Sequence, residues 1–156
     1  MGEDLQSNGE GDQMYLVSSC LAGINCRYDG NNNLDEKVAE LVKAGKAIPV
    51  CPEILGGLAT PRDPSEIIAD QEGNRKVVTE KGKDVTAEFK LGAEKTLEIA
   101  KIVDAKKVIL QQRSPSCGAG KIYDGTFSGN IIKGNGITAE LLIKNGIGVL
   151  SEADLA

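Results

Sequence analysis

The chain has 156 residues, of which 40% are hydrophobic and only five are aromatic, so it is long enough for one domain with an aliphatic core. A formal net charge of −5 argues against binding of long nucleic acids, which requires a basic surface. No apolar run approaches the length of a membrane span and no basic, apolar leader opens the sequence, so we expect a cytoplasmic protein.

The first predicted elements follow a polar head. Residues 1–13 are mostly Gly, Asn, Asp, Glu and Gln, which predicts a disordered head or an expression remnant. Residues 14–19 read as a first strand. After a polar loop, residues 34–44 have helical spacing of apolar positions and stop at a glycine, and residues 47–50 form a second strand. The proline- and glycine-rich residues 52–64 are expected to be a loop.

The middle of the chain combines a hairpin pattern with the longest helical pattern. Residues 67–70 and 76–79 are separated by turn-forming residues and are expected to pair as a hairpin. A helix is predicted from about residue 87 to residue 103, with Asp84 or Thr86 as its cap.

The last third completes an alternating pattern of strands and helices. Residues 107–110 (KVIL) predict a third buried strand, followed by a turn-rich loop at 113–118, a helix at 137–144 and a strand at 147–150. This alternation predicts that residues 14–156 form one α/β domain, a three-layer sandwich with a mostly parallel sheet and helices on both faces, Rossmann-like or flavodoxin-like.

Three of the four cysteines follow predicted strands. Cys20 follows the first strand, Cys51 follows the second, and Cys117 lies in the loop after the third. Loops after parallel strands project from one edge of the sheet, where such folds bind ligands, so these thiols are expected to converge. The alternative is that each cysteine is a small buried hydrophobic residue, although each lies among polar and turn-forming residues.

The residue types restrict the chemistry of such a site. The chain has no histidine, which excludes Ser–His and Cys–His nucleophile pairs and zinc sites with imidazole ligands. Thiolates select zinc, cuprous copper or iron–sulfur clusters. No C-x2-C pair is present, and the closest pair is Cys20 and Cys26. Dispersed ligands favour a cubane cluster, and three cysteines would leave one iron open as a Lewis acid.

Polar residues near these cysteines are candidates for supporting roles. Glu53 is a candidate proton shuttle, or alternatively a loop carboxylate that caps a helix or pairs with Arg62. Ser114 and Ser116 flank a proline and are candidate hydrogen-bond donors to a substrate, or alternatively turn-forming and capping residues.

Five motifs, together with their order, resemble a bacterial thiouracil desulfurase-like family that was long described as a domain of unknown function. The resemblance covers essentially all of residues 15–152. The motifs are SSCLAGINCRYDG (18–30), CPEILGGLATPR (51–62), GKDVT (82–86), RSPSCGAGKIYDGTFSG (113–129) and GNGITAELL (134–142).

This resemblance implies a [4Fe-4S] cluster, of a kind easily lost to oxygen, with Cys20, Cys51 and Cys117 as its ligands. Cys26 remains open: it is a candidate fourth ligand, a spare thiol near the pocket, or a sulfur acceptor.

The resemblance also implies non-redox desulfuration of a thioamide or thiolated pyrimidine similar to 2-thiouracil, present as a free base or nucleoside. The substrate sulfur would bind the open iron and water would attack the ring carbon. Glu53 would move the proton, and Ser114 or Ser116 would donate hydrogen bonds.

Three other interpretations remain at this point. One is an electron carrier or sensor in which Cys26 closes the fourth iron. Another is a binding module with zinc on all four cysteines. The third is a thiol enzyme in which Cys117 begins a helix and has a lowered pKa.

Overall fold

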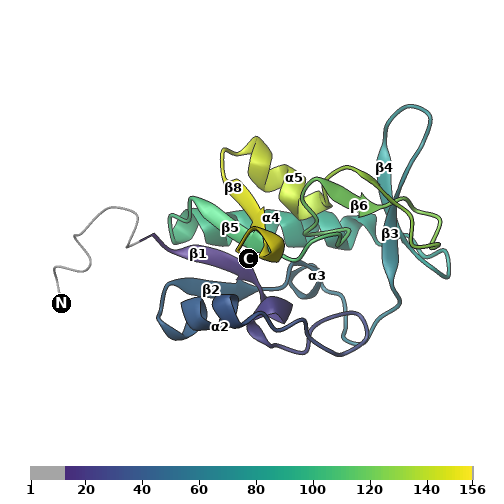
Figure 1. Ribbon diagram of the computed structural model, residues 1–156. Helices are drawn as coiled ribbons and strands as arrows, with labels where there is room; N and C mark the ends of the chain where they lie inside the picture. Colours follow the sequence, from purple (N-terminus) through teal and green to yellow (C-terminus); the bar gives the residue numbers. More distant parts are fainter. Residues whose placement is uncertain (1–12, 156) are drawn as a thin grey trace.

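Four parallel strands form the centre of the protein (Figure 1). The structure is a computed structural model that describes residues 13–155. The strand order across the sheet is β2-β1-β5-β8. Adjacent strands pair in parallel throughout, so all four carboxyl ends lie at one edge. The strands are β1 (Tyr15–Ser18), β2 (Ala47–Val50), β5 (Lys107–Leu110) and β8 (Gly148–Ser151). The predicted head lies outside the described residues, apart from its last position.

Helices cover both faces of the sheet. Successive strand residues point to opposite sides, and both sides carry apolar residues that must be buried. Leu16 and Val108 face one core, which includes side chains of α4 (Thr86–Ile102) and α5 (Ile137–Lys144). Val17 and Ile109 face a second core, where α2 (Glu36–Lys43) packs. The predicted three-layer α/β fold is therefore confirmed.

Two antiparallel hairpins extend the molecule beyond the sheet (Figure 1). The predicted one joins β3 (Ser65–Ala69) to β4 (Arg75–Thr79). The other, β6 (Lys121–Tyr123) with β7 (Ile131–Lys133), falls within a segment without strand-like alternation and was not predicted. A third cluster of buried side chains connects both hairpins to the start of α4: Ile67, Val77, Val85, Phe89 and Ile122.

The helix starts differ from the prediction for reasons of hydrogen bonding. The α2 helix begins at Glu36 rather than residue 34, because the Asp35 carboxylate accepts a hydrogen bond from Val38 N at 3.1 Å. Neither predicted residue caps α4. Asp84 accepts from the backbone N–H of Thr86, while the Thr86 hydroxyl accepts from Val77 N, each at 2.9 Å. The Thr86 hydroxyl therefore anchors β4 instead of capping α4.

Three short helices were not predicted. The α3 helix (Pro52–Leu55) lies within the expected loop at 52–64 and begins with a proline, which suits a first helical position. The 3₁₀ helices η2 (Ser19–Ala22) and η3 (Glu152–Leu155) follow β1 and β8. Within residues 13–155, every helix is too short or too polar to cross a membrane.

Candidate functional site

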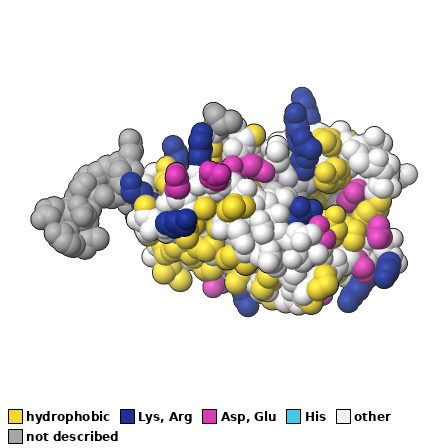
Figure 2. Space-filling view, turned by 60° about the horizontal axis from the view of Figure 1, so that its bottom comes forward, with side chains coloured by type: hydrophobic (Ala, Val, Ile, Leu, Met, Phe, Trp, Pro, Cys, Tyr) yellow, Lys and Arg dark blue, Asp and Glu magenta, His cyan; other side chains and the backbone are white. Residues whose placement is uncertain are grey.

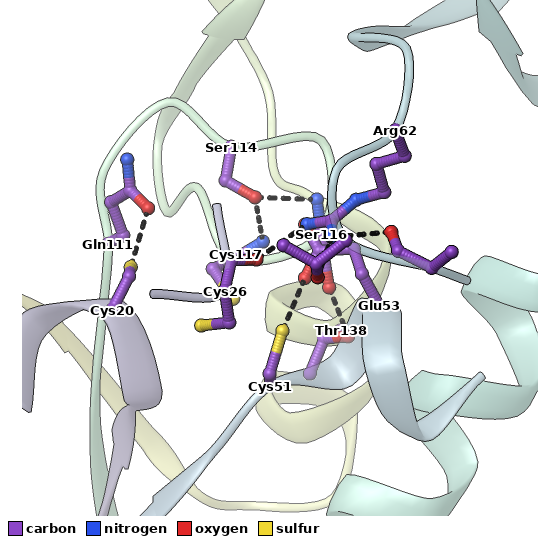
Figure 3. Close-up of polar contacts among 12 residues, drawn as sticks. Cys20, Cys26, Cys51, Glu53, Arg62, Gln111, Ser114, Ser116, Cys117 and Thr138 are labelled. Carbon is purple, nitrogen blue, oxygen red and sulfur yellow. Dashed lines mark hydrogen bonds and ion pairs between the residues drawn. The ribbon is translucent and has the colours of Figure 1, made fainter. Parts of the chain in front are cut away.

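All four cysteines line one cavity of about 940 Å³ at the carboxyl edge of the sheet. Cys20 lies in η2 directly after β1, Cys51 directly follows β2, and Cys117 lies in the loop after β5. Figure 3 shows Cys20, Cys26, Cys51 and Cys117 gathered beside Glu53 and Ser114. The structure thus brings together the three cysteines that the topology predicted would meet, and adds Cys26.

The thiols are free and mostly buried. Cys20, Cys26 and Cys117 are buried and Cys51 is partly buried, with no disulfide among them. A hydrogen bond with Cys26 raises the pKa of the Cys51 thiol, and burial raises it further. Burial also raises the pKa of Cys117, and the Glu53 carboxylate adds to this effect. The thiol-enzyme interpretation required a lowered pKa at Cys117, which is the opposite of what burial produces there.

Cys26 lies between two of the strand-end cysteines. Hydrogen bonding with Cys20 raises the pKa of the Cys26 thiol to about 11, although the interaction with Cys51 acts in the opposite direction. The backbone of this loop is fixed from outside, because Arg62 donates a hydrogen bond to the Cys26 carbonyl at 3.1 Å. The backbone at Cys26 is therefore held in place as part of the cavity wall.

Glu53 faces the cavity from α3 and forms an ion pair with Arg62. Its Oε2 atom is 3.9 Å from the guanidinium, and both side chains are only 14% exposed. Its other oxygen lies 3.8 Å from Cys51 Sγ. The two sequence interpretations of Glu53 are therefore compatible, since the same carboxylate pairs with Arg62 and reaches the cysteines.

A close contact between two helices fixes the position of Cys51 and Glu53. A Cβ atom on Gly92 of α4 would lie 1.9 Å from the carbonyl oxygen of Pro52, and one on Gly56 would lie 1.9 Å from the carbonyl oxygen of Glu88. Only glycine permits this approach of two backbones. The α3 helix is therefore seated directly on α4, with Cys51 as its N-cap residue.

The two candidate serines have different environments. Ser114 lines the cavity, and its Oγ accepts hydrogen bonds from the backbone N–H groups of Ser116 and Cys117, each at 3.0 Å. Ser116 is completely buried, and its hydroxyl lies 2.7 Å from that of Thr138 on α5. This loop also accepts hydrogen bonds from the first residues of α5, through the carbonyls of Pro115 and Ser116. The side chain of Ser114 thus reaches the cavity, whereas that of Ser116 ties the loop to α5.

Gln111 was missed by the sequence reasoning. Its side-chain oxygen accepts a hydrogen bond from Cys20 Sγ at 2.9 Å, and its backbone N–H donates to Ser18 Oγ at 2.9 Å. Gln111 directly follows β5, so the rule that located the cysteines would also have indicated this residue.

The donor set fits a metal cluster better than a single ion. Across residues 13–155, no three Cys, Asp or Glu side chains close on one point that would hold one metal ion. The four thiols instead surround a cavity that also contains a carboxylate. Cysteine thiolates are the usual ligands of iron–sulfur clusters, whereas structural zinc takes four ligands in a tetrahedron.

Comparison with known proteins identifies the family. A profile of the 2-thiouracil desulfurase family matches residues 15–154. The chain belongs to this family. It is 52% identical over 147 residues to the uncharacterized protein YbbK of Bacillus subtilis (strain 168), covering 91% of this chain and 97% of YbbK. Its fold matches the solved structure of the [4Fe-4S]-dependent thiouracil desulfidase TudS with a TM-score of 0.83 and 43% identity, covering 92% and 93% of the two chains. The family predicted from the motifs, and with it a desulfurase-type enzyme, is confirmed.

Proposed function

We propose that this protein converts the C=S group of a 2-thiouracil-like base into C=O by hydrolysis that depends on a [4Fe-4S] cluster. The observation that carries this proposal is the shared cavity, in which cysteines from three strand ends surround a space that also contains the Glu53 carboxylate. Membership of the 2-thiouracil desulfurase family and the likeness to TudS support it independently.

Cys20, Cys51 and Cys117 are the proposed cluster ligands. Each comes from a different strand end, and each thiol must lose its proton to bind iron. A cluster held by these three residues would supply a Lewis acid that polarises the C=S bond of the substrate.

Glu53 is the proposed proton carrier. Its carboxylate accepts a proton from the attacking water, while the ion pair with Arg62 holds it beside Cys51. The ring carbon gains the water oxygen, the carbon–sulfur bond breaks, and the sulfur leaves as sulfide. Water supplies the carbonyl oxygen of the product and both protons of the released hydrogen sulfide. No atom changes its oxidation state, so the reaction needs no electron donor.

Ser114 is the proposed hydrogen-bond donor to the substrate. Its oxygen already accepts from two backbone N–H groups, which leaves the hydroxyl hydrogen to point toward the cavity. Such a donor stabilises the charge that develops on the reacting group. Ser116 has a positioning role in this proposal, since its hydroxyl is committed to Thr138.

A small thiolated base or nucleoside is the proposed substrate. The cavity volume of about 940 Å³ lies at the upper end of the range typical of small-molecule sites. Figure 2 shows acidic and basic side chains interspersed on the visible face, without the basic surface that a long nucleic acid requires. We place this activity in the cytoplasm, where reducing conditions preserve thiols.

The test is to reconstitute the protein without oxygen and to measure iron, acid-labile sulfide and the conversion of 2-thiouracil to uracil. We expect about four iron and four sulfide per chain, as for a cubane cluster. Uracil and free sulfide should be released in equal amounts without a reductant. Correctly folded protein that takes up no iron, or that holds a cluster but releases no sulfide, would refute the proposal.

Cysteine variants separate this proposal from an electron carrier or sensor. Cys51→Ser and Cys117→Ser should lose most of the cluster. Cys26→Ser is the matched control, and it should keep the iron content and absorption spectrum of the wild type. Loss of the cluster in Cys26→Ser would instead indicate four protein ligands and no open iron.

A further inference from the structure

Backbone strain is concentrated at the cavity. Among residues 13–155, only three residues other than glycine have a positive φ angle: Asp104, Arg113 and Phe127. Arg113 and Phe127 both line the cavity. The φ of Phe127 is +58°, a conformation that a bulky aromatic residue rarely adopts. Such outliers persist only where the surrounding structure holds them, and they gather at functional sites.

The loop that carries Phe127 is held in place by Glu66. This loop, residues 124–130, joins β6 to β7. Glu66 lies on β3 and is buried, with 9% of its surface exposed. One of its carboxylate oxygens accepts hydrogen bonds from Gly125 N at 2.9 Å and from Phe127 N at 3.1 Å. A charged acceptor shared by two backbone donors fixes the backbone on both sides of residue 126.

The same loop is also packed directly against β3. A Cβ atom on Gly125 would lie 2.7 Å from the carbonyl oxygen of Ile67. The loop therefore lies closer to this strand than it could if residue 125 had a side chain. Within the loop, the Asp124 carboxylate accepts from Thr126 N at 2.9 Å, and Asp124 N donates to Asn130 O at 3.0 Å. Phe127 is therefore presented by a loop that hydrogen bonds and close packing against β3 hold in place.

We propose that Phe127 is a substrate-binding residue whose ring stacks on the flat face of the heterocyclic substrate, with Glu66 as the residue that positions it. This inference rests on the proposed function for the identity of the substrate. A thiopyrimidine has two apolar ring faces and a polar edge. Aromatic side chains stack on such faces without reading the polar edge, which leaves the C=S edge free to face the cysteines. A phenyl ring also carries no polar group that would compete for that edge.

The decisive variant is Phe127→Gly, measured in anaerobically reconstituted protein. Glycine adopts positive φ without penalty, so the free energy of unfolding should be unchanged or higher. Loss of stacking should weaken uracil binding by about 5- to 150-fold, as measured by calorimetry. The KM for 2-thiouracil should rise by a similar factor, while kcat and iron content change little. A merely structural role for Phe127 predicts the reverse: lower stability with unchanged affinity of the folded protein.

Glu66 and a control variant complete the experiment. Glu66→Ala should weaken uracil binding because it releases the loop, and Glu66→Gln should restore most of it because an acceptor oxygen remains. Ile132→Ala is the control, since Ile132 is an exposed residue of the same hairpin outside the cavity. Uracil has no sulfur, so its affinity tests stacking even if the protein releases no sulfide. Wild-type protein that binds neither uracil nor 2-thiouracil, or a Phe127→Gly variant with wild-type affinity, would overturn this inference.

Discussion

The contact between α3 and α4 provides a strong test of how the site is positioned. In Gly92→Ala, the new Cβ would lie 1.9 Å from Pro52 O, whereas real Cβ atoms essentially never approach closer than 3.0 Å. The two helices must therefore separate by at least 1.1 Å, the difference between these distances. Overpacking of this kind costs about 1–3 kcal/mol. The better helix propensity of alanine offsets about 0.5–1 kcal/mol, which leaves a net loss between about 0 and 2.5 kcal/mol.

The effect on activity should be larger than the effect on stability. Movement of α3 carries Cys51 and Glu53 with it, and a displacement of about 1 Å at a reacting centre lowers kcat by about 100-fold. Urea unfolding, iron content and 2-thiouracil turnover measure the three consequences. Leu91→Ala is the matched control because this exposed neighbour on α4 does not line the cavity. If Gly92→Ala were more stable than the wild type, with full iron content and turnover, the assigned role of this contact would be wrong.

Further predictions concern the residues around the cavity and the Asp84 carboxylate, which accepts a hydrogen bond from the backbone N–H of Thr86. Arg62→Lys keeps the charge but loses the fork that contacts Glu53 and the Cys26 carbonyl, so urea unfolding should show a loss of about 1–3 kcal/mol. Ser116→Ala leaves a buried partner hydroxyl without its hydrogen bond and should lower stability by about 1–3 kcal/mol, with turnover per bound cluster retained. Ser114→Ala should lower kcat by about 100-fold at equal iron content, and unchanged kcat would remove its proposed role. Hydrogen bonds from Thr86 lower the pKa of Asp84 below its ordinary value of 3.8, so its contribution to stability is complete above that pH and is lost as the pH falls through the folded-state pKa. Unfolding measured between pH 5 and pH 3 should therefore show a smaller loss of stability in Asp84→Asn than in the wild type.

The sequence was sufficient to predict the sheet and the meeting of the cysteines. Short apolar runs marked β1, β2 and β5, and the rule that parallel strands end at one edge then placed Cys20, Cys51 and Cys117 together. That inference needs only the order and direction of strands, so errors of one or two residues at their ends do no harm.

The missed elements depend on contacts between distant segments. The α3 helix has four residues, which are too few to show a helical period. Its position depends on Gly56 and Gly92, which let the backbones of α3 and α4 come into contact. The β6–β7 hairpin has three-residue strands, and its loop is fixed by Glu66 from another hairpin. No local pattern in the sequence indicates either contact.

The serines show the same limit at the level of single atoms. Ser114 and Ser116 are two residues apart in one turn and are chemically identical, so the sequence alone could not separate their roles. The turn directs Ser114 Oγ to two backbone N–H groups at the cavity, and it directs Ser116 to Thr138 beneath the loop. Because the loop also receives hydrogen bonds from the start of α5, the Cys117 thiol is held by backbone contacts on both sides. A site built in this way should tolerate changes at its exposed rim far better than the addition of one methyl group at the helix contact that seats Cys51 and Glu53.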